Sequence, residues 1–400
     1  MTRGPAVRKI TVPGFKFAGI SAGIKKSGKR DLALIYSEVP AVAAGVFTTN
    51  RIKAAPVKLA IKNITSGKAQ AIVINSGNAN ACTGENGMKA AREIISCTAK
   101  ELGIASDLVY SSSTGIIGRP FPTNTIKNAL PGLVGQLSYL SLNLAASSIM
   151  TTDTRPKIAF RKIRIAGKNG TIAAIAKGAG MICPNMATML SFIVTDIAIS
   201  PQALNASLRE ASSRSFNLLS VDNDMSTNDT VLIMANGLLN NPIITKRSPY
   251  YAKFSSALNE IAFDLARMIA EDGEGATKSI EVIVKGARSR SDAGEIALSV
   301  AKSMLVKTAV YGRDPNWGRI MAAIGYAGIA VNEKTIDIYL NKIKMVSKGM
   351  GTNKEKAARN SLLNKNITIT VVLGSGKEEA RALTCDLTEG YIKINAHYGT

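Results

Sequence analysis

The chain alternates short apolar runs, rich in β-branched and aromatic residues, with longer segments in which apolar residues recur every three or four positions. The first pattern is typical of buried strands and the second of amphipathic helices. Residues 189–197 show the strand pattern most clearly. Residues 254–271 show the helical one, because Leu258, Ile261 and Leu265 fall on a single stripe.

The same patterns predict regular structure along the whole chain. Strands are expected at residues 31–36, 69–74, 108–112, 231–235, 279–285, 335–340, 367–373 and 380–388, and further helices at residues 85–102, 201–215 and 291–306. Ser200 and Ser291 are the expected N-caps of the last two helices. We expect a domain division near residue 286, which gives a larger domain at residues 1–285 and a smaller one at residues 286–400.

Composition describes a globular chain with room for two or three domains: 400 residues, 46% of them apolar, with a mean hydropathy of +0.10. No apolar run is long enough to cross a bilayer, and the N-terminal residues lack the apolar core of an export signal. Four scattered cysteines and a single histidine argue against a structural zinc site. They favour reduced thiols, and therefore a cytoplasmic protein.

The formal net charge of +22 raises the hypothesis of a nucleic-acid-binding protein. Two observations oppose it. The Lys and Arg residues are spread along the chain, and aromatic residues, on which bases stack, make up only 5%. A positive surface would also attract small acidic substrates, so the charge alone does not decide between a basic binding protein and an enzyme.

The most informative stretch precedes the strand at residues 189–197. Residues 177–185 begin with Lys177, carry two glycines and end in a Pro-Asn turn signal. Thr188 then stands directly before the strand. A threonine in this place is ordinarily a strand residue, packed for its β-branched shape. The alternative is that Thr188 is a nucleophile.

A nucleophilic Thr188 could generate its own base. Its hydroxyl would attack the carbonyl of Ala187, the acyl group would shift from nitrogen to oxygen, and hydrolysis would leave Thr188 as a new N-terminus. An α-amine has a pKa near 8, so it can take up the hydroxyl proton close to neutral pH. The only histidine is His397, and a Ser-His-Asp or Cys-His mechanism would depend on that one residue.

Other polar segments follow predicted strands. Thr114 and Gly115 come after the strand at residues 108–112, where a hydroxyl and a backbone N–H in a turn could stabilise an oxyanion. A plain turn between strand and loop is the alternative. The Asp- and Asn-rich segment at residues 220–230 suggests calcium but lacks the spacing of an EF-hand loop, so no metal is expected there.

The motif at residues 177–190 reads Lys-Gly-x-Gly-Met-x-x-Pro-Asn-Met-Ala-Thr-Met-Leu. It resembles the self-cleavage segment of the ornithine acetyltransferase (glutamate N-acetyltransferase) family of arginine biosynthesis. Residues 45–51 and 312–328 are similar to further segments of that family, and the resemblance extends over about residues 10–400.

The resemblance implies an α+β fold: a layered α/β/β/α-type sandwich similar to N-terminal-nucleophile hydrolases, with a smaller C-terminal α/β domain. It implies self-cleavage between Ala187 and Thr188 into an α chain of 187 residues and a β chain of 213 (400 − 187), assembled as α2β2. The implied reaction moves an acetyl group from N-acetylornithine to glutamate through an acyl-enzyme on Thr188, without a cofactor. The resemblance leaves open whether acetyl-CoA is also a donor.

Family resemblance also assigns roles to individual residues. Thr114 and Gly115 would stabilise the oxyanion beside the nucleophile Thr188. The substrate would be bound by Thr151, Lys177, Thr188, Glu274, Asn395 and Thr400. No metal, nucleic acid or membrane is implied. The nearer alternative is a self-processing aminopeptidase or amidase of similar fold, in which water replaces glutamate, and the remote one is the basic nucleic-acid-binding protein.

Overall fold

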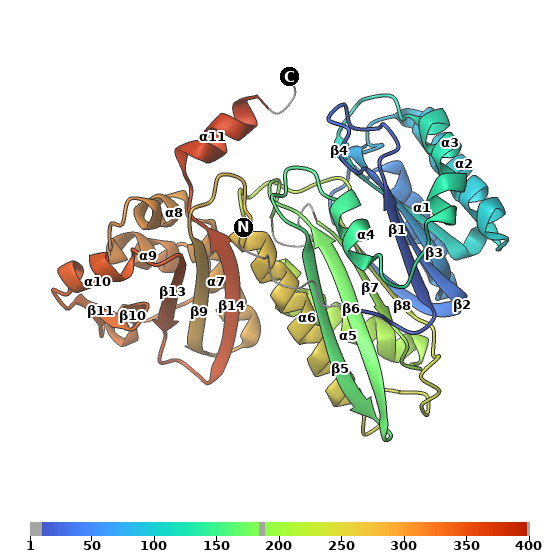
Figure 1. The fold of residues 1–400 in the computed structure, drawn as a ribbon. Coiled ribbons are helices and arrows are strands. Elements are labelled where there is room, and N and C mark those ends of the chain that lie inside the picture. The colour runs from blue at the N-terminus through green and yellow to red at the C-terminus, as the bar shows by residue number, and fades with distance from the viewer. Residues whose placement is uncertain (1–9, 184–188, 398–400) are drawn as a thin grey trace, which may run out of the picture.

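The structure, a computed structural model, describes residues 10–183 and 189–397. It contains an eight-stranded sheet and a six-stranded sheet. We call residues 10–278, which carry the larger sheet, the first lobe, and residues 279–388 the second lobe. Figure 1 shows the lobes side by side, with the long helix α6 (Tyr251–Glu271) of the first lobe next to the second lobe.

The larger sheet runs in the order β4-β3-β2-β8-β7-β6-β5, and β1 pairs with β2. Its strands are β1 (Phe15–Ile20), β2 (Leu32–Phe47), β3 (Lys68–Asn78), β4 (Val109–Ile116), β5 (Lys157–Ile165), β6 (Lys168–Lys177), β7 (Leu190–Thr195) and β8 (Thr230–Ala235). The other helices of this lobe are α1 (Ala55–Asn63), α2 (Gly84–Leu102), α3 (Thr123–Gly135), α4 (Leu142–Ser148) and α5 (Pro201–Arg214).

Strand β2 is long enough to belong to both halves of this sheet. Its first part pairs with β1 and β3, and its second part pairs with β8. The register shifts between Tyr36 and Ala41, around Pro40, which has no N–H to donate to a neighbouring strand. Apolar side chains of β1 to β3 and of β6 to β8 form one buried cluster, so the sheet folds over and its two halves face each other.

Alternation along the strands gives the first lobe four layers. In β6, Ile172 and Ala174 pack against α5 and α6, whereas Ala173 and Ile175 face the other half of the sheet. The strands of that half divide in the same way: one set of side chains fills the shared middle layer and the other packs under α2 and α3. The α+β class and the α/β/β/α layering expected from the sequence are confirmed.

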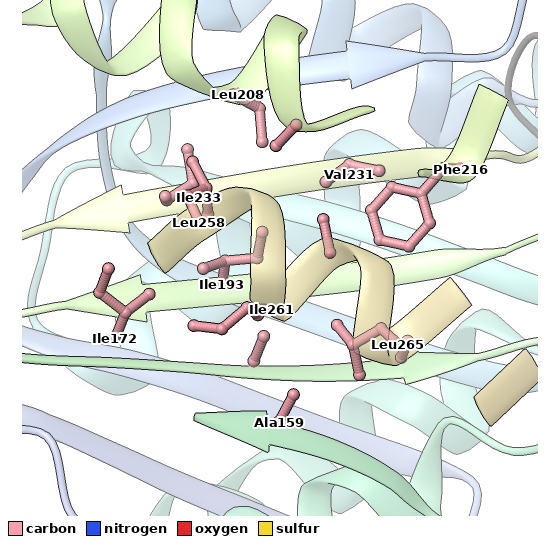
Figure 2. Packing of buried hydrophobic residues seen from close by; sticks show 14 of the residues in the cluster. Ala159, Ile172, Ile193, Leu208, Phe216, Val231, Ile233, Leu258, Ile261 and Leu265 are labelled. Carbon is pink, nitrogen blue, oxygen red and sulfur yellow. The ribbon is translucent and has the colours of Figure 1, made fainter. Parts of the chain in front are cut away.

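Helix α6 supplies most of the apolar stripe that covers β5 to β8. Leu258, Ile261 and Leu265 are fully buried against strand residues such as Ile193 and Ile233, as Figure 2 shows. The spacing of three and four residues predicted this face, because such residues lie on one side of a helix. The stripe anchors the C-terminal end of α6, after which the chain reaches Glu274.

The second lobe is built on strands that are far apart in sequence. Its sheet has the order β12-β11-β10-β13-β9-β14. The elements are β9 (Ser279–Ala287), α7 (Arg290–Lys302), α8 (Met304–Tyr311), α9 (Trp317–Gly325), β10 (Asp337–Leu340), β11 (Ile343–Ser347), β12 (Met350–Gly351), α10 (Glu355–Ser361), β13 (Asn366–Val372) and β14 (Glu378–Cys385). Helix α11 (Glu389–Ala396) follows the lobe.

The expected domain division at residues 285/286 falls inside β9. All partners of β9 lie in the second sheet, where it pairs parallel with β13 and antiparallel with β14. We propose the division just before Ser279, because it keeps both sheets whole. Local hydrophobic pattern could not locate it, since the paired residues of β9 and β13 are 87 positions apart (366 − 279) and their pairing leaves no signal between them.

Three local expectations need correction. The helix expected at residues 291–306 is two helices, because the Ser303 hydroxyl accepts the N–H of Val306 and caps a new helix, α8. Its first part is capped by Ser289 rather than Ser291. Strand β4 continues through Thr114 and Gly115, which were expected in a turn. In the described part of the chain, no helix is long and apolar enough to cross a membrane.

We expect the α6 stripe to be a main source of stability. Ile261→Ala should lower the free energy of unfolding by about 2–5 kcal/mol, because the side chain is fully buried and the core cannot close the cavity completely. Ile243→Ala is the matched control, since Ile243 is 67% exposed and should change the value by less than about 0.5 kcal/mol. Urea titration followed by circular dichroism measures both, and equal losses would contradict this packing.

Candidate active site

A cavity of about 280 Å³ lies where several strand ends and loops of the first lobe meet helix α11. Of the residues expected from the sequence, six line it: Thr114, Gly115, Thr151, Lys177, Glu274 and Asn395. They come from five separate segments of the chain, so the fold brings together residues up to 281 positions apart (395 − 114). Ala187, Thr188 and Thr400 lie outside the described residues.

The end of β4 forms one wall of the cavity. Gly115 has a φ of +133°, a backbone conformation that residues with a side chain rarely adopt. It is paired with Gly77 of β3, and a Cβ on Gly115 would lie 2.3 Å from the carbonyl carbon of Gly77. Only glycine fits there, and the close approach holds the backbone beside Thr114 rigidly at the cavity edge.

Lys177 is the last residue of β6 and is almost fully buried, with 2% of its surface exposed. Its strand partner is Leu190, the first residue of β7. Burial lowers the pKa of Lys177, and the nearby Asp153 carboxylate opposes that shift because it favours the charged ammonium. The ammonium group lies 3.9 Å from Asp153 Oδ2.

Asp153 connects Lys177 to a second buried cation. Lys157 Nζ lies 2.6 Å from Asp153 Oδ1 and 2.6 Å from Asp272 Oδ2. Burial would raise the pKa of Asp153, but Lys177, Lys157 and the N–H of Gly178 hold it at about 2. Asp153 is therefore a charged carboxylate beneath the cavity near neutral pH.

Glu274 supplies the negative charge of the cavity. It follows α6, and its N–H donates to the carbonyl of Ala179 at 2.8 Å. The Asn395 amide of α11 donates to Glu274 Oε2 at 2.8 Å. A Cβ on Gly180 would lie 2.3 Å from Glu274 Cδ, so the glycine makes room for this carboxylate.

Among the described lining residues, Lys177 and Glu274 are the two with charged side chains. The remaining walls are hydroxyl and amide groups together with the apolar side chains of Ile116, Ile117 and Met181. A site of this kind can bind a small molecule that carries one carboxylate, one ammonium group and a short chain between them.

The Asp- and Asn-rich segment at residues 220–230 turns out to support the cavity. Asn228 lines it, and its amide donates to the carbonyls of Ala79 and Ser113, both at 2.7 Å. Asp222 accepts the N–H groups of Met181 and Ile182 at 2.6 and 2.8 Å. These side chains are occupied by backbone groups, and the described residues contain no cluster of three or more His, Cys, Asp or Glu suited to a metal ion.

Asp229 anchors the start of β7. Its Oδ1 accepts the N–H of Met189, the residue after Thr188, at 3.2 Å. The carboxyl group is fully buried, and burial raises its pKa well above the usual value for an aspartate. Met189, the first described residue after residues 184–188, is thus held by a side chain next to the cavity residue Asn228.

Comparison with known proteins identifies the family to which this chain belongs. The ArgJ family model matches residues 16–400. The chain belongs to the ArgJ family. As a member of this family it is an acyltransferase of arginine biosynthesis, and the family predicted from the sequence is confirmed.

ArgJ relatives match the chain over nearly its whole length. The arginine biosynthesis bifunctional protein ArgJ of Geobacter sulfurreducens is 49% identical over 98% of this chain and 100% of its own. A crystal structure of ArgJ from Bacillus halodurans is 45% identical, with a TM-score of 0.51, over 52% of this chain and 99% of the solved chain. The ornithine acetyltransferase of Mycobacterium tuberculosis, in complex with ornithine, is 34% identical over 44% of this chain and 96% of its own, with a TM-score of 0.40.

Sequence reasoning missed the residues that support the cavity. Asn228 was interpreted as part of a rejected metal loop, and Asp153, Lys157 and Asp272 were not singled out. A signal did exist for Asp153, because it lies in the Thr-Thr-Asp-Thr run that begins with Thr151. For the others, the partners are strand and loop groups that only the folded chain brings close.

We expect Asn228 to be essential for the wall that carries Thr114. Asn228→Ala would leave the buried carbonyls of Ala79 and Ser113 without a donor, at a cost of about 1–3 kcal/mol each. Urea unfolding should therefore show a clear loss of stability. Asn205→Ala is the control, because Asn205 is exposed on α5 and bonds only the Arg209 side chain. Equal stability of the two variants would contradict the supporting role.

Proposed function

We propose that the protein transfers the acetyl group of N-acetylornithine to glutamate in two steps, through an acetyl ester on Thr188. The observation that carries this proposal is that one cavity is lined by Thr114 and Gly115, by the buried cation Lys177 and by the carboxylate of Glu274. In the first step Thr188 takes the acetyl group and ornithine leaves. In the second step the amine of glutamate attacks the ester. This forms N-acetylglutamate, which leaves, and restores the hydroxyl of Thr188.

The charges of the cavity suit this pair of substrates. Lys177 binds the α-carboxylate that N-acetylornithine and glutamate share. Glu274, held by Asn395, binds the side-chain ammonium of the ornithine half or takes part in proton transfer. Thr151 and Thr400 complete the substrate contacts. Because both substrates carry the same α-carboxylate, one cation can orient donor and acceptor in turn.

Thr188 becomes the nucleophile when the chain is cut before it. Cleavage between Ala187 and Thr188 releases an α-amine, which then takes the proton of its own hydroxyl. Two observations support this step. Met189, one residue further on, is held by Asp229, so the cleavage point is close to an anchored strand end. The solved Bacillus halodurans chain is about half as long as this one and is matched almost completely.

Thr114 and Gly115 stabilise the negative oxygen of the tetrahedral intermediate. A hydroxyl and a backbone N–H that are held in advance are effective because they do not have to reorganise during the reaction. The fixed approach of Gly115 to Gly77 supplies that rigidity. We further propose an α2β2 assembly in the cytoplasm, with no cofactor needed for the exchange. Acetyl-CoA as a second donor would account for the word bifunctional in the names of the relatives.

The test of this function is a transfer assay with labelled acetyl groups. The purified protein is incubated with N-acetylornithine and glutamate, and N-acetylglutamate, ornithine and free acetate are measured. We expect N-acetylglutamate to equal ornithine, with little acetate. Free acetate in place of N-acetylglutamate would instead show the aminopeptidase or amidase alternative, in which water is the acceptor.

Thr188→Ala should leave one uncleaved chain without transferase activity, because the variant has neither the hydroxyl nor the means to expose the α-amine. Intact mass under denaturing conditions and the transfer assay measure the two effects. Ser191→Ala, three residues further on in β7, is a suitable control and should still be cleaved. Full activity of the Thr188→Ala variant would exclude Thr188 as the nucleophile.

Thr114→Ala should slow turnover about a hundredfold or more, because one oxyanion donor is lost. The effect should appear in kcat rather than in KM, since the donor acts on the transition state. Ser112→Ala is the matched control: Ser112 lies on the same strand, its buried hydroxyl has no partner among the described residues, and it does not line the cavity. Similar kcat values for both variants would reject the role of Thr114.

A further inference from the structure

The residue beneath the cavity that joins most of its parts is Asp153. Asp153 Oδ1 accepts hydrogen bonds from the N–H of Gly178 at 2.7 Å and from Lys157 Nζ at 2.6 Å. Oδ2 accepts the N–H of Thr151 at 3.0 Å and lies 3.9 Å from Lys177 Nζ. One carboxylate therefore contacts the loop of Thr151, the end of β6 and the loop that follows it.

A second carboxylate holds Lys157 from the other side. Asp272, at the end of α6, lies 2.6 Å from Lys157 Nζ and also accepts the N–H and the hydroxyl of Thr154. The side chains of all four charged residues are at most 3% exposed. Two cations and two anions balance each other, as buried charges require.

The distance from Asp153 to Lys177 has a chemical consequence. At 3.9 Å the carboxylate attracts the ammonium group, but it is too far away to take a hydrogen bond from it. Asp153 thus leaves the N–H groups of Lys177 available for a ligand. At the same time its negative charge favours the charged form of the ammonium group that would attract the ligand. Lys157, by contrast, donates hydrogen bonds to both Asp153 and Asp272.

We propose that Asp153 is a positioning residue that keeps Lys177 charged and directed into the cavity, and so restricts the site to substrates with a carboxylate. This inference rests on the proposed role of Lys177 as the carboxylate-binding group. Lys157 and Asp272 fix Asp153 in turn, and they complete a chain of alternating charges from α6 to the cavity. Asp153 does not touch the substrate.

The charged groups that face Lys177 come from several elements: Asp153, Lys157, Glu274, Asp229 and Lys25. Lys157 and Lys25 disfavour its charged form, as burial does, whereas the three acidic residues favour it when ionised. Burial holds Asp229 towards its neutral form. Glu274 is occupied by Asn395 and, in the proposed function, by the substrate amine. Asp153 is the carboxylate left to sustain the charge of Lys177.

The test is the pH profile of kcat/KM for N-acetylornithine in Asp153→Asn. Without the carboxylate, the charged form of Lys177 loses its support and its pKa falls. Because binding requires the charged form, the loss of kcat/KM at high pH should begin at a lower pH, by about one unit or more. At a pH above the shifted limb, KM should rise about tenfold or more, with a smaller change in kcat.

Two matched variants separate this effect from general damage. Asp272→Asn removes the far carboxylate, which contacts Lys157 but not Lys177, and should move the limb less than Asp153→Asn does. Asp264→Asn lies on the same helix α6 and breaks ion pairs with Arg161 and Arg267 on the surface. It should leave the profile unchanged. Equal shifts in all three, or a rise in KM without any shift, would overturn the proposal.

A second measurement does not depend on catalysis. In wild-type protein labelled with [13Cε]lysine, the Lys177 resonance, assigned through Lys177→Arg, should titrate as a charged ammonium at pH 7. A neutral Lys177 at pH 7 would overturn the inference whatever the variants show. If the wild type transferred no acetyl group, the proposed function would fail, and comparison of this titration in the wild type and in Asp153→Asn would still decide whether Asp153 sustains the charge.

Discussion

The position of Lys177 depends on the register of three neighbouring strands in the larger sheet, β6, β7 and β8. β6 ends at Lys177, which pairs with Leu190 at the start of β7, and Leu190 pairs with Thr230 at the start of β8. A shift of one residue would turn every side chain of a strand to the opposite face. The α6 stripe packs against these strands, so the apolar core holds the register that the chemistry needs.

A buried cation such as Lys177 is destabilising unless its charge is balanced, and here neighbouring charged side chains balance it in place of water. Asp153 and Lys157 lie behind Lys177, and Glu274 lies across the cavity. The same aspartate also binds two backbone N–H groups, so the charge balance and the shape of the loops depend on one side chain. Removing one partner of such a group typically costs about 3–5 kcal/mol.

The local hydrophobic pattern was enough to predict the helices at residues 85–102 and 254–271 and most strands. The spacing of buried apolar residues within each of these elements is visible in the residues of that element alone. It could not predict the fold-over of the sheet near Pro40 or the place of β9, since both follow from pairing between distant segments. Resemblance located Lys177, Glu274 and Asn395. The supporting roles of Asp272 and Asn228 could be recognised only in the folded structure, because nothing near these residues in the sequence indicates their hydrogen-bond partners.

Trapping the acyl-enzyme tests the two-step mechanism most directly. The protein is incubated with N-acetylornithine alone, quenched in acid and weighed by mass spectrometry. We predict that the fragment beginning at Thr188 gains the mass of one acetyl group, located on that residue. Addition of glutamate should remove it and release one equivalent of N-acetylglutamate. Rapid transfer between the two substrates with no acetyl group on Thr188 at any time would contradict the two-step mechanism.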